Sequence, residues 1–185
     1  MHRFYVTHRI EGEIVSLSDP AQFHHLKNVL RLKVNDEVVV CDQPGNEYLC
    51  LITELQKKEA LLTIRGRKAA KTRKMTLTVA CAIPKKAKFE EIVDSLTQLG
   101  VDGIIPMETE RVIVRMDDSK KEARLKRWRQ IAQSAAQQSQ RNTIPMIEPI
   151  TNIENVLSRS HDFALKLLPT LSGERKHIPE RAFLI

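Results

Sequence analysis

The most constraining feature of this sequence is a change of rhythm on either side of a basic run. Before the run "GRKAAKTRK", short segments rich in β-branched residues are separated by turn residues such as "QPGN". After it, segments with strand character alternate with segments of helical periodicity. Dense short strands are typical of a small barrel or sandwich, whereas the alternation indicates βαβ units and a mostly parallel sheet. We therefore expect a β-barrel over residues 1–70 and an α/β domain over residues 75–185.

The expected barrel has one helix among its strands. Asp19 is a suitable cap, Pro20 suits the first helical turn, and "AQFHHLKNVLRL" follows. The expected strands are "RFYV", "EIVSL", "DEVVVCD", "EYLCLITEL" and "ALLTIRG".

The expected α/β domain begins with "MTLTVACAI", a nearly continuous apolar run that predicts a strand buried on both faces. Helices are expected at "KFEEIVDSLTQLG", along the segment that ends in "IAQSAAQQSQ", and around "NIENVL". Further strands or short apolar runs are expected at "DGIIPME", "RVIVRM", "FALKLL" and "AFLI".

Composition excludes several classes of protein. A hydrophobic content of 42% supports a packed core, and no stretch approaches the length of a membrane span. The basic N-terminus has no apolar region of the kind found in secretion signals. Cys41, Cys50 and Cys81 match no metal-binding spacing, and an odd number of cysteines suggests reduced thiols. We expect a cytoplasmic protein without a metal site or a membrane partner.

The formal net charge of +7 suits an anionic partner, although composition does not distinguish RNA, DNA and acidic lipid. The basic run supplies three candidate phosphate contacts, Lys71, Arg73 and Lys74. A solvated linker explains the same residues.

Three lysines, Lys85, Lys86 and Lys88, crowd the start of a predicted helix directly after a predicted strand. Lysines are unfavourable at a helix N-terminus, which carries partial positive charge. Bound phosphate at this strand-to-helix turn would offset that effect. Ordinary surface lysines are the alternative, and the glycines of a Walker A loop are missing.

The long helix ends in a polar stripe. Arg127, Gln130, Ser134, Gln137 or Gln138, and Arg141 recur at steps of three and four, without a carboxylate. Amides and guanidiniums suit phosphates, sugars and base edges. On this stretch alone, a solvated helix face is the simpler explanation.

Charged residues also follow the predicted strand "DGIIPME". Glu108 and Glu110 suit acid–base chemistry, but a surface pair of glutamate and arginine explains them equally well. Arg111 is a candidate contact for an anion because it follows a strand end. The sequence shows no Ser/His/Asp arrangement, and it identifies no catalytic base.

Four blocks in this order resemble the ribosomal RNA small-subunit methyltransferase E family, which belongs to the SPOUT superfamily. They are "MHRFYV", "HHLKNVLRLKVNDEVVVCD", "IPKKAKFEEIVDSLTQLGVDGIIPMETER" and "KRWRQIAQSAAQQSQRNTIP". The resemblance implies a PUA-like barrel followed by a trefoil-knot α/β domain. It also implies methylation of uridine N3 in 16S ribosomal RNA, with S-adenosylmethionine as the cofactor and the small ribosomal subunit as a partner.

The resemblance assigns RNA contacts to Arg31 in the barrel and to Gln138, Arg141 and Asn142 near the RNA cleft of the catalytic domain. It assigns one wall of the methyl-donor pocket to Leu168 and Pro169. Arg111 and Arg141 are candidates for stabilising a uridine anion.

The family's "GPEGGF" loop and its later "LG..ILR.ETA" segment, which build the knot, most of the donor pocket and much of the homodimer interface, do not occur in this chain. The resemblance therefore implies that the 185-residue form binds the methyl donor poorly or not at all, and that its dimerisation is weakened. The alternative is a non-catalytic RNA-binding module without a complete donor pocket. A third possibility, an unrelated phosphate-binding enzyme, rests on the lysines before Phe89 alone.

Overall fold

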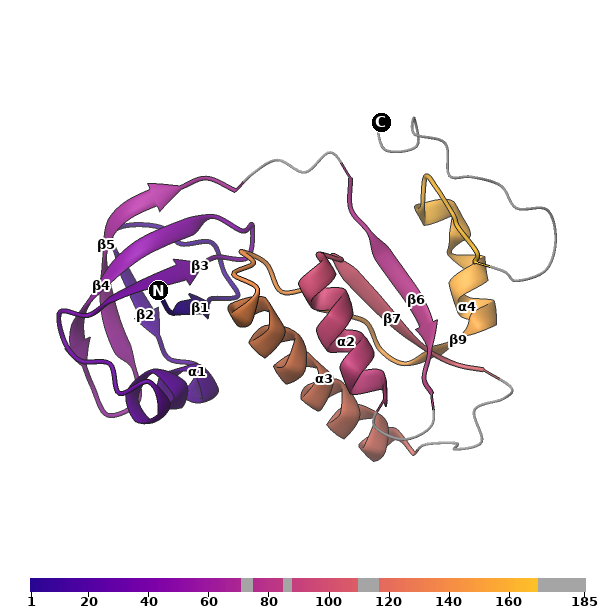
Figure 1. Cartoon of the computed structure of the whole chain (residues 1–185), viewed down its shortest axis with the longest axis horizontal. Coiled ribbons are helices and arrows are strands. Elements are labelled where there is room, and N and C mark those ends of the chain that lie inside the picture. The colour runs from indigo at the N-terminus through magenta and orange to yellow at the C-terminus, as the bar shows by residue number, and fades with distance from the viewer. Residues whose placement is uncertain (71–74, 85–87, 110–116, 170–185) are drawn as a thin grey trace. The chain divides into compact units, whose positions relative to one another are not determined.

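A computed structural model describes residues 1–70, 75–84, 88–109 and 117–169 of the chain. The chain divides into two compact units (Figure 1). The first unit comprises Met1–Thr72 together with Gln133–Ile144, and the second comprises Arg73–Ala132 together with Pro145–Ile185. Residues 133–144, which the sequence placed in the α/β domain, are therefore grouped with the barrel. The domain limits expected from the sequence stay a prediction.

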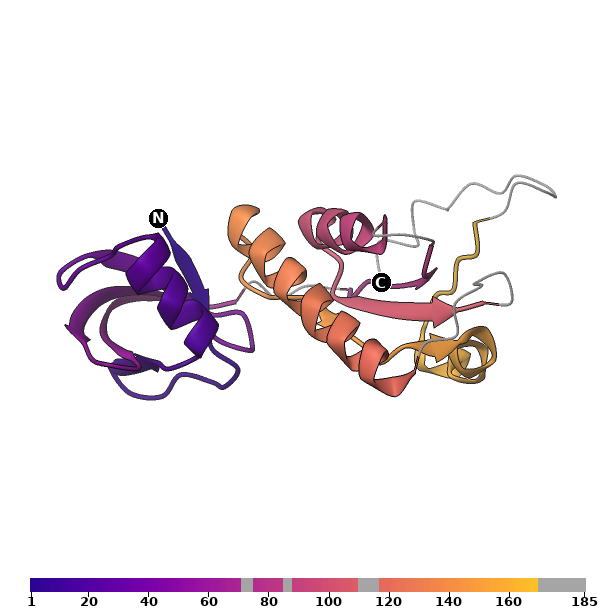
Figure 2. The ribbon, with the colours of Figure 1, turned by 90° about the horizontal axis from the view of Figure 1, so that it is seen from below.

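The first unit is built on a curled sheet (Figure 2). In the described residues the sheet has five strands in the order β1-β3-β4-β5-β2. Strand β1 pairs with β3 in parallel, and the other pairs are antiparallel. The bounds are β1 Arg3–Tyr5, β2 Ile14–Leu17, β3 Glu37–Cys41, β4 Glu47–Leu55 and β5 Ala60–Lys68. All five strands expected from the sequence are confirmed, and the sheet curls as a half-barrel.

The curled sheet encloses one apolar core. Phe4, Leu17, Val38, Ile52 and Leu62 are at most 1% exposed and belong to a single cluster. Strand β2 shows how the sequence directs this packing, because its residues alternate between exposed and buried positions. The alternation therefore fixes which face of the strand turns inward.

The predicted helix of the first unit has two parts. Helix α1, Pro20–His24, is capped by Asp19, whose carboxylate accepts a hydrogen bond from the backbone N–H of Gln22 at 2.9 Å. A π-helical turn, η1 His25–Val29, continues it. The Gln22 side chain is buried and bonds to both main-chain groups of Tyr5, accepting from its N–H and donating to its carbonyl oxygen, each at 2.7 Å. These bonds fix α1 against β1.

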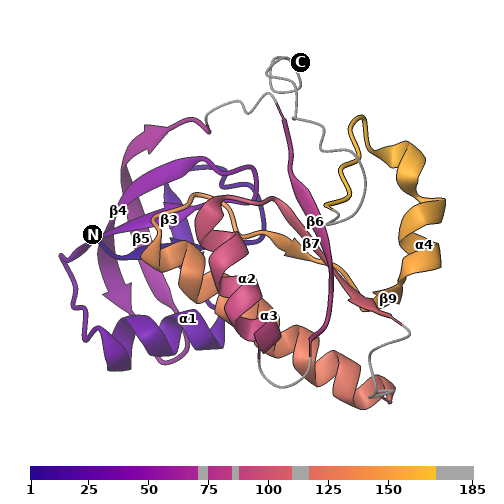
Figure 3. The same cartoon turned by 45° about the vertical axis from the view of Figure 1, so that its right-hand side comes forward.

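The second unit contains a parallel sheet, as the sequence predicted. In the described residues its order is β6-β7-β8, with β9 also paired to β7. Helices α2 and α3 lie on one side of β6 and β7, and α4 lies on the other (Figure 3). The bounds are β6 Thr78–Ala82, α2 Lys88–Leu99, β7 Gly103–Glu108, α3 Asp118–Gln138, β8 Met146–Ile147, β9 Thr151–Asn152, α4 Ile153–Ser158 and η2 Ser160–Asp162.

The core of this unit joins α2 to α3 and β7. The rings of Phe89 and Trp128 pack with their centroids 4.3 Å apart, and both residues are 2% exposed. Val93 on α2 and Ile104 on β7 are fully buried. The aromatic pair therefore fixes the contact between the two helices.

Two expectations for the second unit were wrong. Strand β6 is not buried on both faces, because each of its residues is half-buried or exposed. In the described part of the sheet it pairs with one neighbour, β7, and an apolar run does not reveal whether a strand is central or at an edge. Residues 163–168 form no strand, and Leu165 and Leu167 are at least 50% exposed. The predicted segments "RVIVRM" and "AFLI" lie wholly outside the described residues.

Candidate functional site

The residues that the sequence selected for function fall into two groups. Those outside the described residues stay predictions; they are Lys71, Arg73, Lys74, Lys85, Lys86 and Arg111. The others lie in the described residues; they are Arg31, Lys88, Gln138, Arg141, Asn142, Leu168 and Pro169.

Helix α3 ends in a tight turn within the first unit. The amide nitrogen of Arg141 donates to the carbonyl oxygen of Ala136 at 2.9 Å, and that of Gln140 donates to the carbonyl of Gln137 at 3.3 Å. Gln140 has a φ of 55°, a left-handed conformation that glycine usually provides after a helix. The chain therefore reverses direction directly after Gln138.

Arg3 of β1 holds the segment that follows this turn. Its Nη1 donates to the Asn142 Oδ1 at 2.7 Å, to the Glu47 Oε2 at 3.0 Å and to the Cys41 Sγ at 3.1 Å. The Asn142 Nδ2 donates to the carbonyl oxygen of Gly45 at 3.2 Å. Both ends of the Asn142 amide are thus engaged within the first unit.

The surroundings of Arg3 keep its charge and its contacts intact. Burial by itself would lower the pKa of the guanidinium, but the contacts with Cys41 and Glu47 outweigh that effect and raise the pKa. Burial raises the pKa of the Cys41 thiol, which the nearby guanidinium only partly offsets. Arg3 is therefore a permanent cation beside a protonated thiol and a carboxylate.

Additional contacts fix the end of α3 on β1. The Tyr5 hydroxyl donates to the Arg141 carbonyl oxygen at 2.8 Å, and the Gln137 Nε2 donates to the Arg3 carbonyl oxygen at 3.0 Å. Burial raises the pKa of Tyr5, so its hydroxyl stays a donor at neutral pH. Ala136 packs in an apolar cluster with Tyr5 and Val39. Hydrogen bonds and apolar packing therefore both hold the end of α3 against β1.

The turn between β3 and β4 approaches the same segment closely. A Cβ added to Gly45 would lie 2.8 Å from the Cγ2 of Thr143, and Gly45 has a φ of 89°. Glycine is therefore required here for both its small size and its backbone conformation. We call the group formed by Arg3, Glu47, Asn142 and Gly45 the Arg3 clamp.

The predicted RNA contacts at the end of α3 differ in their accessibility. Gln138 is exposed, whereas Arg141 is 9% exposed and Asn142 is half-buried. Sequence reasoning did not find Arg3, Glu47 or Tyr5 as partners of this segment. The available signal was weak: Arg3 is the single charged residue at the start of an otherwise apolar strand.

Other charged groups on α3 pair within the second unit. Arg127 makes two contacts with Glu90 of α2, at 2.5 and 2.8 Å, and the hydrogen bond from Arg127 lowers the pKa of Glu90. The polar stripe on α3 contains no carboxylate, but Arg127 within it pairs with a carboxylate on α2. Glu108, at the end of β7, pairs with Lys121 at 3.2 Å. In the described residues, the ion pair of Glu108 is therefore with a lysine of α3.

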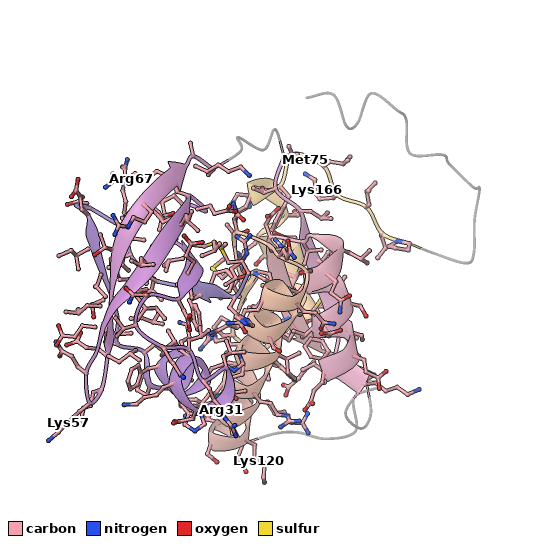
Figure 4. The ribbon with its side chains drawn as sticks, turned by 60° about the vertical axis from the view of Figure 1, so that its left-hand side comes forward. Arg31, Lys57, Arg67, Met75, Lys120 and Lys166 are labelled. Carbon is pink, nitrogen blue, oxygen red and sulfur yellow. The ribbon has the colours of Figure 1, made fainter. Side chains whose placement is uncertain are left out.

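The two remaining predicted cations are exposed. Lys88 begins α2, whose first turn carries Glu90 and Glu91, so these carboxylates complement the positive helix end. Arg31 lies after the π-helical turn and has a φ of 53°, which is uncommon for a residue other than glycine. Figure 4 shows it at the edge of the first unit's helical segment. Its side chain is open to solvent.

Leu168 and Pro169, the predicted wall of the methyl-donor pocket, stay a prediction. Leu168 is 88% exposed, and Pro169 is also exposed. In the described residues, no group of three or more histidine, cysteine, aspartate or glutamate side chains is placed to hold a metal ion. No helix among them is long and apolar enough to cross a membrane.

Comparison with protein families identifies the two units. Residues 17–65 match the family described as "RNA methyltransferase PUA domain", and residues 71–182 match "RNA methyltransferase domain". Ribosomal RNA small subunit methyltransferase E of Mesomycoplasma hyopneumoniae is 30% identical over 91% of this chain and 70% of the relative. The chain belongs to the ribosomal RNA small subunit methyltransferase E family.

Other members of this family are similar in sequence and structure. The Bacillus subtilis enzyme is 32% identical over 77% of this chain and 56% of the relative. The crystal structure of the Neisseria gonorrhoeae enzyme bound to S-adenosyl methionine has a TM-score of 0.77, with 31% identity over 86% of this chain and 66% of that chain. This chain therefore spans little more than half the length of the Bacillus relative.

Proposed function

We propose that this chain forms part of an S-adenosylmethionine-dependent methyltransferase that modifies uridine N3 in 16S ribosomal RNA. The observation that carries this proposal is the match of two RNA methyltransferase modules, in order, along one chain. A relative of similar fold binds S-adenosyl methionine. The net charge of +7 is consistent with an RNA substrate.

The proposal also includes the finer fold and assembly that the resemblance implies. The parallel sheet of the second unit would belong to a SPOUT-type trefoil-knot domain, and the enzyme would act as a homodimer. We also propose Leu168 and Pro169 as one wall of the methyl-donor pocket, as the resemblance implies. Uridine N3 carries a proton that must leave for methylation to occur, and no described residue is assigned as the acceptor.

We propose that RNA is contacted mainly by exposed side chains. In the described residues these are Arg31, Lys88 and Gln138. The residues selected from the sequence alone are Lys71, Arg73, Lys74, Lys85, Lys86 and Arg111. The burial of Arg141 and the two amide contacts of Asn142 favour a different role for these two, which is to hold the helix end in place.

The test of the proposed function uses 16S ribosomal RNA that lacks the modification. The protein is incubated with this RNA and labelled S-adenosylmethionine, and the nucleosides are analysed by mass spectrometry. We expect labelled N3-methyluridine at one position, where the methyl group blocks base pairing and stops reverse transcription. RNA binding without methyl transfer by this chain, in an assay where a full-length family member prepared identically does transfer the methyl group, would favour the non-catalytic alternative.

A further inference from the structure

At the end of α3, the exposed amide of Gln138 lies between anchored neighbours, and the exposed Gln140 follows it in the turn. Gln137 is bonded to the Arg3 carbonyl oxygen, and Ala136 is fully buried. On the other side, the carbonyl of Arg141 is bonded to Tyr5, and Asn142 is held by Arg3. Gln138 itself is exposed. Its backbone is thus fixed from both directions while its side chain stays available to a ligand.

We propose that Arg3 is a positioning residue for RNA binding, which holds Gln138 in a fixed orientation through its contact with Asn142. The inference rests on the proposed function, because Gln138 is taken there as an RNA contact. It goes further by assigning a role to Arg3, a half-buried residue of β1 that lies 139 positions from Asn142 in the sequence. The RNA contact at the end of α3 then belongs to the barrel unit.

The charges of the clamp exclude a direct phosphate contact as the main role of Arg3. Its side chain is 11% exposed and lies 3.0 Å from the Glu47 carboxylate, which balances its charge. A guanidinium that binds phosphate displaces counterions and steepens the dependence of affinity on salt. A guanidinium that only positions a neutral amide leaves that dependence unchanged, because an amide displaces none.

The amide of Gln138 suits a polar group of RNA that carries no charge of its own. A glutamine side chain offers one acceptor and two donors, and such groups pair with base edges or the ribose 2′-hydroxyl. An anchored backbone lowers the entropy lost when this side chain is immobilised by RNA. We therefore expect the loss of Arg3 to resemble the loss of Gln138.

The experiment measures the affinity of the 185-residue chain for protein-free 16S ribosomal RNA at several salt concentrations. We expect Gln138→Ala and Arg3→Met each to weaken binding by about 2- to 10-fold, the range for one hydrogen bond. The double variant should be no weaker than either single variant, because both remove the same contact. Arg3→Lys, which keeps the charge and one donor direction, should restore part of the affinity.

The salt dependence separates positioning from direct contact. We expect the slope of log affinity against log salt to be the same for the unaltered chain, Arg3→Met and Gln138→Ala. Arg31→Met, which removes an exposed cation, should flatten it by roughly one phosphate contact. A flatter slope for Arg3→Met, or full additivity of Arg3→Met and Gln138→Ala, would overturn the inference.

A control variant shows whether stability alone changes the affinity. Gln140→Gly relieves the left-handed backbone next to the clamp and should raise the melting temperature by roughly 2–4 °C, with unchanged RNA affinity. If affinity followed melting temperature across all variants, Arg3 would have a structural role alone and the inference would be wrong. If the unaltered chain did not bind RNA at all, the proposed function itself would fail.

Discussion

The two units of this chain hold their sheets in place by different means. In the first, the strands curl around a shared aliphatic core, and Phe4, Val38 and Leu62 are fully buried within it. In the second, β6 stays half-exposed, and the contact between α2 and α3 depends on the pair of Phe89 and Trp128. The first unit is therefore built on an aliphatic core that its strands share, whereas α2 and α3 of the second unit meet through a buried aromatic pair. A substitution within that pair should be costly.

The largest expected effect tests the aromatic contact between α2 and α3. Trp128→Ala should reduce the free energy of unfolding of the second unit by about 3–5 kcal/mol, because it removes a buried indole and its contact with Phe89. Denaturant unfolding followed by circular dichroism measures the loss. Trp128→Phe, which keeps an aromatic ring, should lose much less. A loss below 1 kcal/mol for the alanine variant would show that the helices are held elsewhere.

A pair of strand substitutions sharpens the contrast between the two sheets. Leu62→Ala in β5 should cost about 2–4 kcal/mol, because Leu62 is fully buried. Val79→Ala in β6 should cost about 1 kcal/mol, since Val79 is only half-buried. Both are measured by the same unfolding experiment. Equal losses would mean that β6 is as well packed in solution as the barrel strands.

Substitution of the buried Gln22 should reduce the stability of the first unit by less than the loss of Trp128 or Leu62. Gln22→Leu keeps a side chain of similar size but leaves the N–H and carbonyl groups of Tyr5 without their partner. We expect a loss of about 1–3 kcal/mol. Gln43→Leu, at an exposed glutamine of the same unit, is the control and should change stability by less than about 0.5 kcal/mol. Equal effects of the two variants would argue against a special role for Gln22.

The smallest expected effect concerns pH and the exposed ion pair of the second unit. The hydrogen bond from Arg127 holds the pKa of Glu90 below its ordinary value of 4.5. The stabilisation is therefore fully present above pH 4.5 and is lost as the pH falls through the lowered pKa. The melting temperature of Glu90→Gln should be slightly below that of the unaltered chain at pH 7 and should approach it in acid. A difference independent of pH would exclude this ion pair as its cause.

Much of the fold follows from local patterns in the sequence. Alternating residues such as those of β2 predict a strand with one buried face, and Asp19 with Pro20 predicts the start of α1. Whether β6 is a central or an edge strand could not be predicted in this way, because that depends on neighbouring strands that no local pattern encodes. The same holds for residues 163–168, where an apolar composition was mistaken for a strand.

The site was less predictable than the fold because its contacts join distant parts of the chain. The polar stripe pointed to Gln138 as a candidate, and that residue is exposed. The Arg3 clamp was not predicted, since Arg3 and Asn142 are 139 positions apart. The carboxylate facing Arg127 comes from Glu90, 37 positions away. Spacing within a helix reveals which side chains share a face but not what opposes them.

Strand β1 lies at one margin of the curled sheet, and glutamine amides occupy its outer side. Gln22 bonds to the N–H and carbonyl groups of Tyr5, and Gln137 bonds to the carbonyl oxygen of Arg3. Unpaired main-chain groups at a sheet margin are a template for strand addition and aggregation. Here side chains take the place of a neighbouring strand, so this margin is closed to another chain. A partner of the barrel at this margin must therefore be recognised through side chains rather than by extending the sheet.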